Sequence, residues 1–508
     1  MKKIFAYILL ALPLLTSCVS DDSDFGSDKN NIEISGVEKE YEVTSFAGKS
    51  LVIAPTITTD YDDDDLEYTW TYYDPNENFD NYNKEHKATV VSREKTLNYP
   101  MNLLDGEYVF YLTVTSKSTG YSQQSKKITV DVASALSKGF YVCKENAEGN
   151  TDVDLYNTTE GTMLENLLAN YNGKALKGKP LCMDVISGLP YMDPDTETGA
   201  YGNCLCLTTQ DGNVEWVRLV DMKTVKDADN CHYEKVEGEI PYRTVRGYWT
   251  IYYMTNNYAY NSYSGSMGGI GVLGSFAGNG ASQHVVTNAN SFYCMAYWDQ
   301  AHHGLGFSDY NGSYAEPQSK VTGYKATDTG YDCITSGNCG AGGNNLSFFL
   351  LKDASGNRLF YFVNVTSSNV SVTDVRPVEA GTHLANANLF AVNCRQATLL
   401  YCVDNNKVYA YDLAGNNAER ALTFQGLPDN EQITYIANRY YDDDNGFDYL
   451  MVGTQSGDTY KVYMYNMVGG EPSGKPALVI TGTGKLRKVD YANPNIVDTA
   501  DKTPLLDD

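Results

Sequence analysis

Short runs in which apolar and polar residues alternate follow one another along most of this 508-residue chain. Residues 66–72 and 106–115 are the clearest examples before residue 133, and alternation with a period of two is typical of a half-buried β-strand. About seven such runs, separated by polar turns, fall within residues 32–133. This density predicts an immunoglobulin-like β-sandwich with Trp70 in its core.

Residues 139–491 are predicted to form a second, larger all-β domain. Its runs come in pairs joined by a turn of Asp, Asn or Gly, and residues 399–403 and 407–413 show the pattern best. Turns near residues 355, 405 and 456 are 50 and 51 residues apart, a period that suits a four-stranded propeller blade. We therefore predict a β-propeller of about seven blades, for which one or two further sandwiches are the alternative.

Three further segments complete the predicted organisation. In residues 162–171, the apolar side chains Met163, Leu164, Leu167 and Leu168 share one face of a helix, so a helix is predicted there. Residues 485–491 form the last strand-like run, and we expect them to pair with the first blade and close the ring. Residues 492–508 carry Pro, Asn and Asp, and are predicted to be a disordered tail.

The first 31 residues differ from the rest of the chain in their pattern of charged and apolar residues. Lys2 and Lys3 precede an apolar run, residues 4–15, that is too short to span a bilayer as a helix. Leu15, Thr16, Ser17 and Cys18 then follow, and this order resembles the lipobox of bacterial lipoproteins. The resemblance implies a signal peptide at residues 1–18, and acylation of Cys18 by chains such as palmitate, which hold the mature chain on a membrane.

Residues 19–31 are predicted to be an acidic flexible tether. Asp21, Asp22 and Asp24 lie directly after the cysteine and resemble the acidic export tag of Bacteroidetes surface lipoproteins. That resemblance implies an outer-membrane protein that faces the cell exterior. The formal net charge of −26 repels nucleic acid, so DNA and RNA are excluded as partners.

Most of the 11 cysteines lie in apolar strand-like runs, where they are expected to be small buried thiols. Cys333 and Cys339 bracket a segment that is predicted to be a loop, and the sequence leaves a disulfide between them open. Their spacing is not that of a CxxC pair, which argues against zinc.

No motif for catalysis stands out, since no His-Glu-x-x-His, Gly-x-Ser-x-Gly or phosphate-loop sequence occurs. We therefore predict a protein that is not an enzyme and has no cofactor. Alternating acidic residues offer weak calcium sites, with a solvated turn as the default interpretation: Asp193 and Asp195 in one segment, Asp442 and Asp444 in another.

Aromatic residues mixed with Asn, Gly and Ser are densest between residues 248 and 314. Rings supply contact area at low entropic cost and amides supply hydrogen bonds, so the segment is predicted to bind a ligand. Long loops that pack on themselves are the alternative. The candidate ligand-binding residues are Tyr248, Trp249, Tyr258, Tyr260, Tyr263, Trp298, His302 and Tyr310.

The N-terminal strands resemble PKD-type immunoglobulin-like domains in two motifs. Tyr68 and Trp70 form one, and Gly106, Tyr108, Leu112 and Val114 form the other. The chain departs from the family at residues 71–74, where Thr-Tyr-Tyr-Asp replaces the usual Trp-Asp-Phe-Gly-Asp.

With the lipobox and acidic tag, nearly the whole chain resembles the PKD-like surface lipoproteins of Bacteroidetes. That resemblance implies a non-catalytic accessory or ligand-binding component of a SusC/SusD-type, TonB-dependent importer of oligopeptides or glycans. A surface adhesion or scaffolding module is one alternative. A propeller hydrolase or lyase using Asp299, Asp309 and His302 is another.

Overall fold

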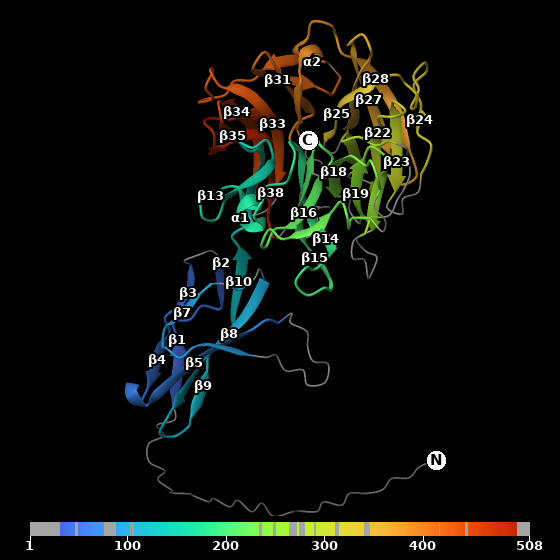
Figure 1. The fold of residues 1–508 in the computed structure, drawn as a ribbon. Helices are drawn as coiled ribbons and strands as arrows, with labels where there is room; N and C mark the ends of the chain where they lie inside the picture. Colours follow the sequence, from blue (N-terminus) through green and yellow to red (C-terminus); the bar gives the residue numbers. More distant parts are fainter. Residues whose placement is uncertain are drawn as a thin grey trace, which may run out of the picture. The chain divides into compact units, whose positions relative to one another are not determined.

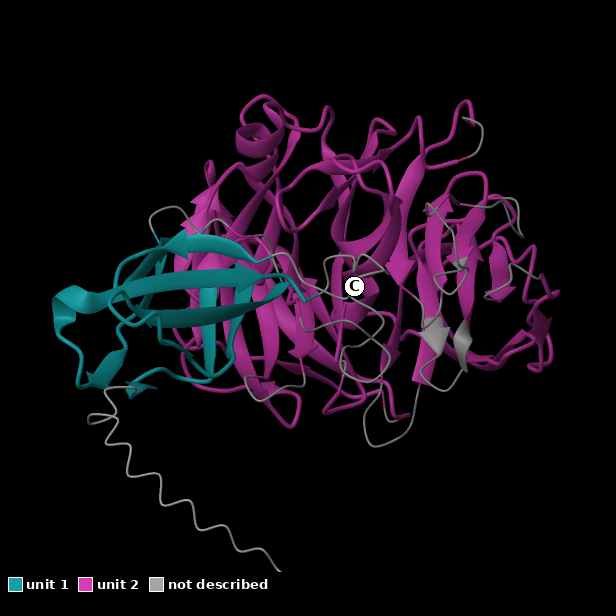
Figure 2. Ribbon diagram, turned by 90° about the horizontal axis from the view of Figure 1, so that it is seen from below, with its two compact units in different colours: residues 1–43, 47–102, 106–132 teal, residues 44–46, 103–105, 133–508 magenta. Residues whose placement is uncertain are grey.

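The computed structural model describes residues 31–45, 49–75, 88–101, 103, 106–232, 236–246, 250–263, 272–273, 280–288, 291–309, 314–339, 346–393, 395–415, 417–441 and 446–494. The chain divides into two compact units, which Figure 2 distinguishes by colour. Unit 1 comprises Met1–Val43, Ala47–Asn102 and Gly106–Val132, and unit 2 comprises Thr44–Phe46, Leu103–Asp105 and Ala133–Asp508.

Unit 1 is built from short antiparallel strands. Its elements are β1 (Ile32–Ser35), β2 (Glu40–Ser45), β3 (Ser50–Ile53), β4 (Thr56–Thr59), the 3-10 turn η1 (Asp63–Asp65), β5 (Leu66–Tyr73), β6 (Thr89–Ser92), β7 (Leu97–Pro100), β8 (Gly106–Ser116), β9 (Ser122–Gln124) and β10 (Ile128–Ser134). The largest sheet has the order β2-β10-β8-β5-β6, with β9 paired to β8, and two-stranded sheets are formed by β1 with β4 and by β3 with β7.

Trp70 is the centre of the unit 1 core, as the sequence predicts. Its side chain is fully buried on the internal strand β5, and its Nε1 donates to the carbonyls of Glu94 and Lys95 at 3.1 and 3.3 Å. The strand beside it, β8, buries every second residue from Tyr108 to Ser116. A half-buried strand with this period needs a second layer, and the two small sheets supply strands for it.

Unit 2 holds seven sheets in the part of the chain that the structure describes. The first contains β11 (Gly139–Glu145), β12 (Thr151–Asn157), β13 (Thr162–Leu164) and β38 (Lys485–Ala492), with the helix α1 (Leu167–Asn172) following β13. The second contains β14 (Pro180–Met192), β15 (Gly199–Thr209), β16 (Val214–Arg218) and β17 (Thr224–Asp227). The third contains β18 (Pro241–Arg246), β19 (Thr250–Thr255) and β20 (Ala259–Tyr263), and the fourth β21 (Val285–Asn288), β22 (Ser291–Asp299) and β23 (Gly304–Asp309).

The remaining three sheets follow in the same way along the chain. The fifth contains β24 (Gln318–Ser319), β25 (Asp332–Cys339), β26 (Leu346–Lys352), β27 (Arg358–Val365) and β28 (Val370–Pro377). After the helix α2 (His383–Asn386), the sixth contains β29 (Leu389–Val392), β30 (Leu399–Asp404), β31 (Lys407–Asp412) and β32 (Glu419–Ala421). The seventh contains β33 (Gln432–Tyr441), β34 (Phe447–Ser456), β35 (Thr459–Val468), β36 (Glu471–Pro472) and β37 (Leu478–Thr483).

The sheets of unit 2 follow one another in chain order around a ring, from teal to red in Figure 1. An apolar cluster lies between each sheet and the next in the described residues. Leu155 of the first sheet meets Leu205 of the second, for example, and the last cluster joins Met464 of the seventh sheet to Val142 of the first. Each sheet is therefore buried on both faces, and the predicted β-propeller fold after an N-terminal sandwich is confirmed.

The ring closes through the last described strand, as the sequence predicts. β38 pairs antiparallel with β11, and Val489 faces Val142 in that register. The first sheet is thus assembled from both ends of unit 2. Strand β38 also contacts β14 and β33, the first strands of the sheets on either side.

Two local predictions are wrong. Residues 162–171 do not form one helix, because Thr162, Met163 and Leu164 pair with β12 as the outer strand of the first sheet. The helix starts only at Leu167, where the carboxylates of Asp152 and Asp154 accept hydrogen bonds from the backbone amides of Leu168 and Asn166.

The segment between Cys333 and Cys339 is not a loop, because both cysteines lie on the extended strand β25. Six residue steps at about 3.3 Å each separate them by roughly 20 Å, beyond the reach of a disulfide. None of the cysteines in the described residues forms a disulfide.

Candidate functional site

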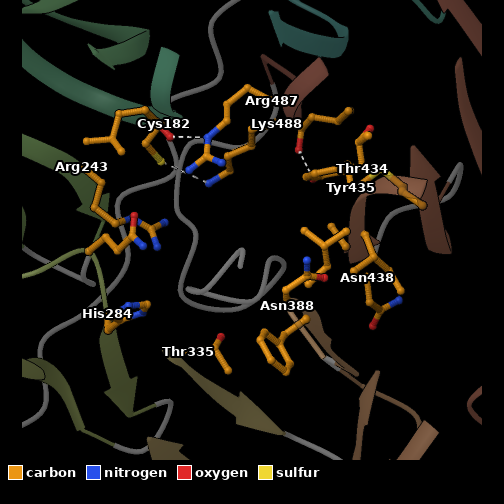
Figure 3. A pocket seen from close by; sticks show the side chains of 18 of the residues that line it. Cys182, Arg243, His284, Thr335, Asn388, Thr434, Tyr435, Asn438, Arg487 and Lys488 are labelled. Atoms are coloured by element: carbon orange, nitrogen blue, oxygen red, sulfur yellow. Dashed lines mark hydrogen bonds between the residues drawn. The ribbon is translucent and has the colours of Figure 1, made fainter. Parts of the chain in front are cut away.

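A cavity of about 280 Å³ opens in unit 2 where one edge strand of each sheet, or the residues directly before it, converge. All seven sheets, or the residues directly before them, contribute to its wall (Figure 3). In chain order around the ring, the contributions include Cys182, Arg243, His284, Thr335, Phe390, Asn438 and Lys488. Because these residues come from consecutive sheets, the cavity belongs to the central channel of the propeller.

Three ionic side chains form the best-defined contact at this cavity. The carboxylate of Asp184 on β14 accepts hydrogen bonds from Arg243 Nη2 at 2.8 Å and from Lys488 Nζ at 2.9 Å. Burial alone would raise the pKa of Asp184, but the charges of Arg243 and Lys488 outweigh it and lower this pKa below its usual value. The group therefore keeps its charge at neutral pH and ties β14 to β18 and β38.

A second buried carboxylate holds another cation in place. Asp490 accepts from the backbone amides of Val185 and Tyr491 at 2.9 and 2.7 Å, and its Oδ1 lies 3.2 Å from Arg439 Nη2. Arg439 lines the cavity from β33. Its position is thus fixed by a partner on the neighbouring strand β38.

Arg487 differs from these ionic groups because it is exposed. Its Nε donates to the carbonyl of Leu181 at 2.7 Å, and no carboxylate of the described residues lies within 4.0 Å of its guanidinium. Figure 3 shows it beside Lys488, on the side of Cys182. The guanidinium is therefore held at one end by the backbone while its charge is not balanced by a described neighbour.

The cavity as a whole is electropositive. Four cations, Arg243, Arg439, Arg487 and Lys488, line it, while two carboxylates, Asp184 and Asp490, contact them. The local net charge is +2, within a chain of formal net charge −26. An anion is attracted to this point of a protein that otherwise repels it.

His284 and Cys182 complete the polar wall without adding charge. Burial, together with the nearby charge of Arg243, lowers the pKa of His284 to about 4, so the imidazole is neutral at pH 7. Burial raises the pKa of Cys182, whose thiol lies 3.5 Å from Asp184 Oδ2 and 3.9 Å from Lys488 Nζ. A protonated thiol is a poor nucleophile, so the group of residues suits binding better than covalent catalysis.

None of the predicted ligand-binding residues whose side chains the structure describes lines this cavity. Tyr260 and Trp298 belong to the core, 2% and 1% exposed, so their prediction as ligand-binding residues is wrong: each packs between two sheets. Tyr258 is exposed, and its ring packs edge-on against Tyr260 at 5.6 Å. Tyr248, Trp249 and Tyr310, together with the side chain of Tyr263, lie outside the described residues.

His302 lines a different cavity, of about 390 Å³, in the fourth sheet. Its Nδ1 lies 2.8 Å from Asp299 Oδ2, and Tyr297 and Tyr314 line the same cavity. The Nδ1 of the adjacent His303 lies 3.0 Å from the carbonyl oxygen of Tyr331 instead. The two histidines therefore have separate partners.

The calcium candidates that the structure describes carry cationic partners. Arg218 Nη1 lies 2.8 Å from Asp193, and the carboxylate of Asp195 contacts both Arg218 and Lys223. Hydrogen bonds from Lys223 and Arg218 lower the pKa of Asp195. The contacts assign these two carboxylates to an ion-pair network, while Asp442 and Asp444 lie outside the described residues.

No group of three or more His, Cys, Asp or Glu in the described part of the chain is placed to hold a metal ion. Nor does any described helix have the length and apolar character needed to cross a membrane.

The sequence interpretation missed the channel residues, although a signal for them exists. Asp184, Arg243 and Lys488 each interrupt an otherwise strand-like run. A charge at a buried strand position needs a partner, so such interruptions mark residues that meet in the fold. The pairing itself could not be predicted from the sequence, since Asp184 and Lys488 are 304 residues apart.

Comparison with known families finds a match in the first part of the chain. Residues 23–180 match the model of the PKD-like family, a stretch that includes unit 1 from residue 23 onward and the first elements of unit 2. No curated protein matches the chain.

Similar solved structures include the periplasmic gluconolactonase PpgL of Pseudomonas aeruginosa, with a TM-score of 0.40 and 10% identity over 70% of this chain and 99% of that one. A DUF4784 family protein from Bacteroides caccae has a TM-score of 0.34 and 10% identity over 78% and 96%. The dihydro-heme d1 dehydrogenase NirN has a TM-score of 0.36 and 9% identity over 75% and 72%.

Proposed function

We propose that this chain is a lipid-anchored, non-catalytic binding protein of the outer cell surface, and that its channel cavity holds a small ligand for a SusC/SusD-type nutrient importer. The observation that carries the proposal is the cavity itself. Its wall is contributed by every sheet of the ring, and its polar groups are fixed by buried ion pairs. A site that is organised before the ligand arrives has less entropy to lose on binding.

The N-terminal sequence supports the proposed location at the cell surface. Residues 15–18 have the order of a lipobox, and three aspartates follow the cysteine closely. Acyl chains on Cys18 contribute about 0.8 kcal/mol for each methylene group that they bury in the bilayer. The acidic body then remains outside, tethered by residues 19–31.

Membrane fractionation and protease treatment of intact cells test the location. The wild-type chain should sediment with the outer membrane and be digested by external protease, whereas Cys18→Ala should leave the membrane fraction. Ser17→Ala, which keeps a small residue before the cysteine, is the control and should stay anchored. Wild-type chain that remains intact on protease-treated cells would contradict surface display.

Isolation of native outer-membrane complexes tests the role in import. The chain should copurify with a TonB-dependent barrel and its lipoprotein partner. Isolation of the chain alone under conditions that preserve other such complexes would favour an adhesion or scaffolding module instead.

A surface hydrolase is the second candidate, and the cavity at His302 is the observation that favours it. The carboxylate of Asp299 orients the His302 imidazole through Nδ1, an arrangement that general bases use. Turnover of a cell-surface substrate that is lost in His302→Ala and kept in His303→Ala would favour catalysis over simple binding.

A further inference from the structure

The charges around the channel cavity indicate what kind of ligand it accepts. The cavity carries a net charge of +2 while the chain carries −26, so the positive potential is local and built by particular residues. Three of its four cations already contact a carboxylate: Arg243 and Lys488 contact Asp184, and Arg439 contacts Asp490. Those three are held rigidly, which leaves the fourth, Arg487, with a distinct role.

Arg487 has the geometry of an anion-binding group. Its Nε donates a hydrogen bond of 2.7 Å to the carbonyl of Leu181, and this bond fixes the plane of the guanidinium. Its two terminal nitrogens have no carboxylate of the described residues within 4.0 Å. A guanidinium that is oriented and exposed presents two parallel donors, which match the two oxygens of a carboxylate.

The rest of the wall fits a small organic body rather than a bare inorganic ion. Phe390, Tyr435 and Val489 give the cavity an apolar side, and Asn388, Thr335 and the neutral imidazole of His284 offer uncharged hydrogen-bonding groups. A volume of about 280 Å³ accommodates a ligand of the size of one sugar or one amino acid.

We propose that the channel cavity binds a small organic carboxylate, with Arg487 as the residue that receives the carboxylate group. The acidic end of a glycan, such as a uronic acid, and the acidic end of a peptide share this chemistry. The inference rests on the proposed binding function and deepens it by naming the ligand class.

Isothermal titration calorimetry of the full chain in detergent tests the ligand class. D-galacturonate and N-acetylglutamate are the two carboxylate probes, D-galactose is the neutral counterpart of the first, and inorganic phosphate is the simple anion. At least one carboxylate probe should bind with an affinity that falls as salt is added, while galactose and phosphate bind at least tenfold more weakly. Which of the two carboxylates binds tells the glycan source from the peptide source.

Variants on strand β38 test the role of Arg487. Arg487→Met should weaken carboxylate binding about tenfold or more, because a charge-assisted bidentate contact is lost, and Arg487→Lys should recover part of it. Lys485→Met removes the same charge from the same strand outside the cavity, where Lys485 contacts Glu145 at 2.9 Å. That control should bind within twofold of the wild-type affinity.

Three results would overturn the inference: equal binding of galactose and galacturonate, phosphate binding as tight as that of either carboxylate, or unchanged affinity in Arg487→Met. Binding of a neutral sugar alone would overturn the carboxylate inference while leaving the proposed binding function standing. No binding of any probe by a chain that copurifies with an importer would overturn the inference and leave the importer association intact.

Discussion

Tyrosine and glycine face each other across neighbouring strands at several points in unit 2. Gly306 is opposite Tyr297, Gly482 is opposite Tyr460, and Gly453 is opposite Tyr435. In the first two pairs the ring lies over the glycine, where a Cβ would come within 2.1 to 2.3 Å of ring or hydroxyl atoms. The pairs account for part of the abundance of tyrosine, 42 residues, since a ring that covers a glycine replaces the side chain packing the glycine lacks.

Gly306→Ala should therefore destabilise unit 2 by about 1 to 3 kcal/mol, because the added methyl group displaces the buried Tyr297 ring. Urea denaturation followed by the fluorescence of buried tryptophans measures the change. Gly199→Ala is the matched control on a strand, since a Cβ there meets no atom within 4 Å. Equal stability of the two variants would show that the ring moves aside at little cost.

His284 makes the stability of unit 2 depend on pH. Its pKa is about 4 in the folded chain and about 6.5 in an unfolded one, so between these values the unfolded chain binds more protons. Stability therefore rises with pH across this window, by up to about 3 kcal/mol from this group. His284→Gln should flatten that part of the profile of urea midpoint against pH, while His303→Gln, at a half-exposed side chain, should leave it unchanged.

At the scale of elements, the hairpin turns can be predicted from the local sequence, whereas the partners of the buried charges cannot. The turn between β30 and β31 shows why: Asn405 and Asn406 both adopt left-handed backbone conformations, with φ of 50° and 59°. Asparagine tolerates that conformation well, so the turn is visible in the sequence. The position of β13 is not visible in the sequence, because pairing with β12 overrides the helical spacing of the apolar residues.

A buried ion pair within the first sheet is hydrogen-bonded to the seventh sheet. Lys144 Nζ lies 2.6 Å from Asp154 Oδ1, both side chains are at most 1% exposed, and Tyr460 of β35 donates to Asp154 Oδ2 at 2.6 Å. Asp154→Ala should lower the free energy of unfolding by about 3 to 5 kcal/mol, since it leaves the Lys144 charge buried without its ion-pair partner.

The double variant Lys144→Met with Asp154→Leu tests this explanation by urea denaturation. Removing both charges should recover most of the lost stability, because the cost lies in the uncompensated charge rather than in the absence of the pair. A double variant as unstable as Asp154→Ala would instead point to the lost hydrogen bond from Tyr460.

At the scale of the whole molecule, the sequence predicts the fold class better than it predicts what the strands enclose. The spacing of turns 50 and 51 residues apart indicates repeated sheets, and a repeat implies a ring. The channel cavity is assembled from residues between 181 and 489, which all seven sheets or the residues directly before them contribute. No local pattern indicates that Arg487 and His284 line one cavity, so the sequence interpretation did not bring them together.

Ring closure by β38 is the feature on which the whole of unit 2 depends. The strand completes the first sheet, and its Val489 and Tyr491 enter the cluster shared with the seventh sheet. At the channel, its Lys488 contacts Asp184 and its Asp490 contacts Arg439. A chain that ends before Lys485 should lose cooperative unfolding of unit 2, because the edge of β11 and both apolar faces of its sheet are then open to water. A chain that ends after Pro494 keeps every described strand and should unfold as the full chain does. Equal urea profiles for the two truncated chains would show that the ring is stable while open and that β38 serves the cavity alone.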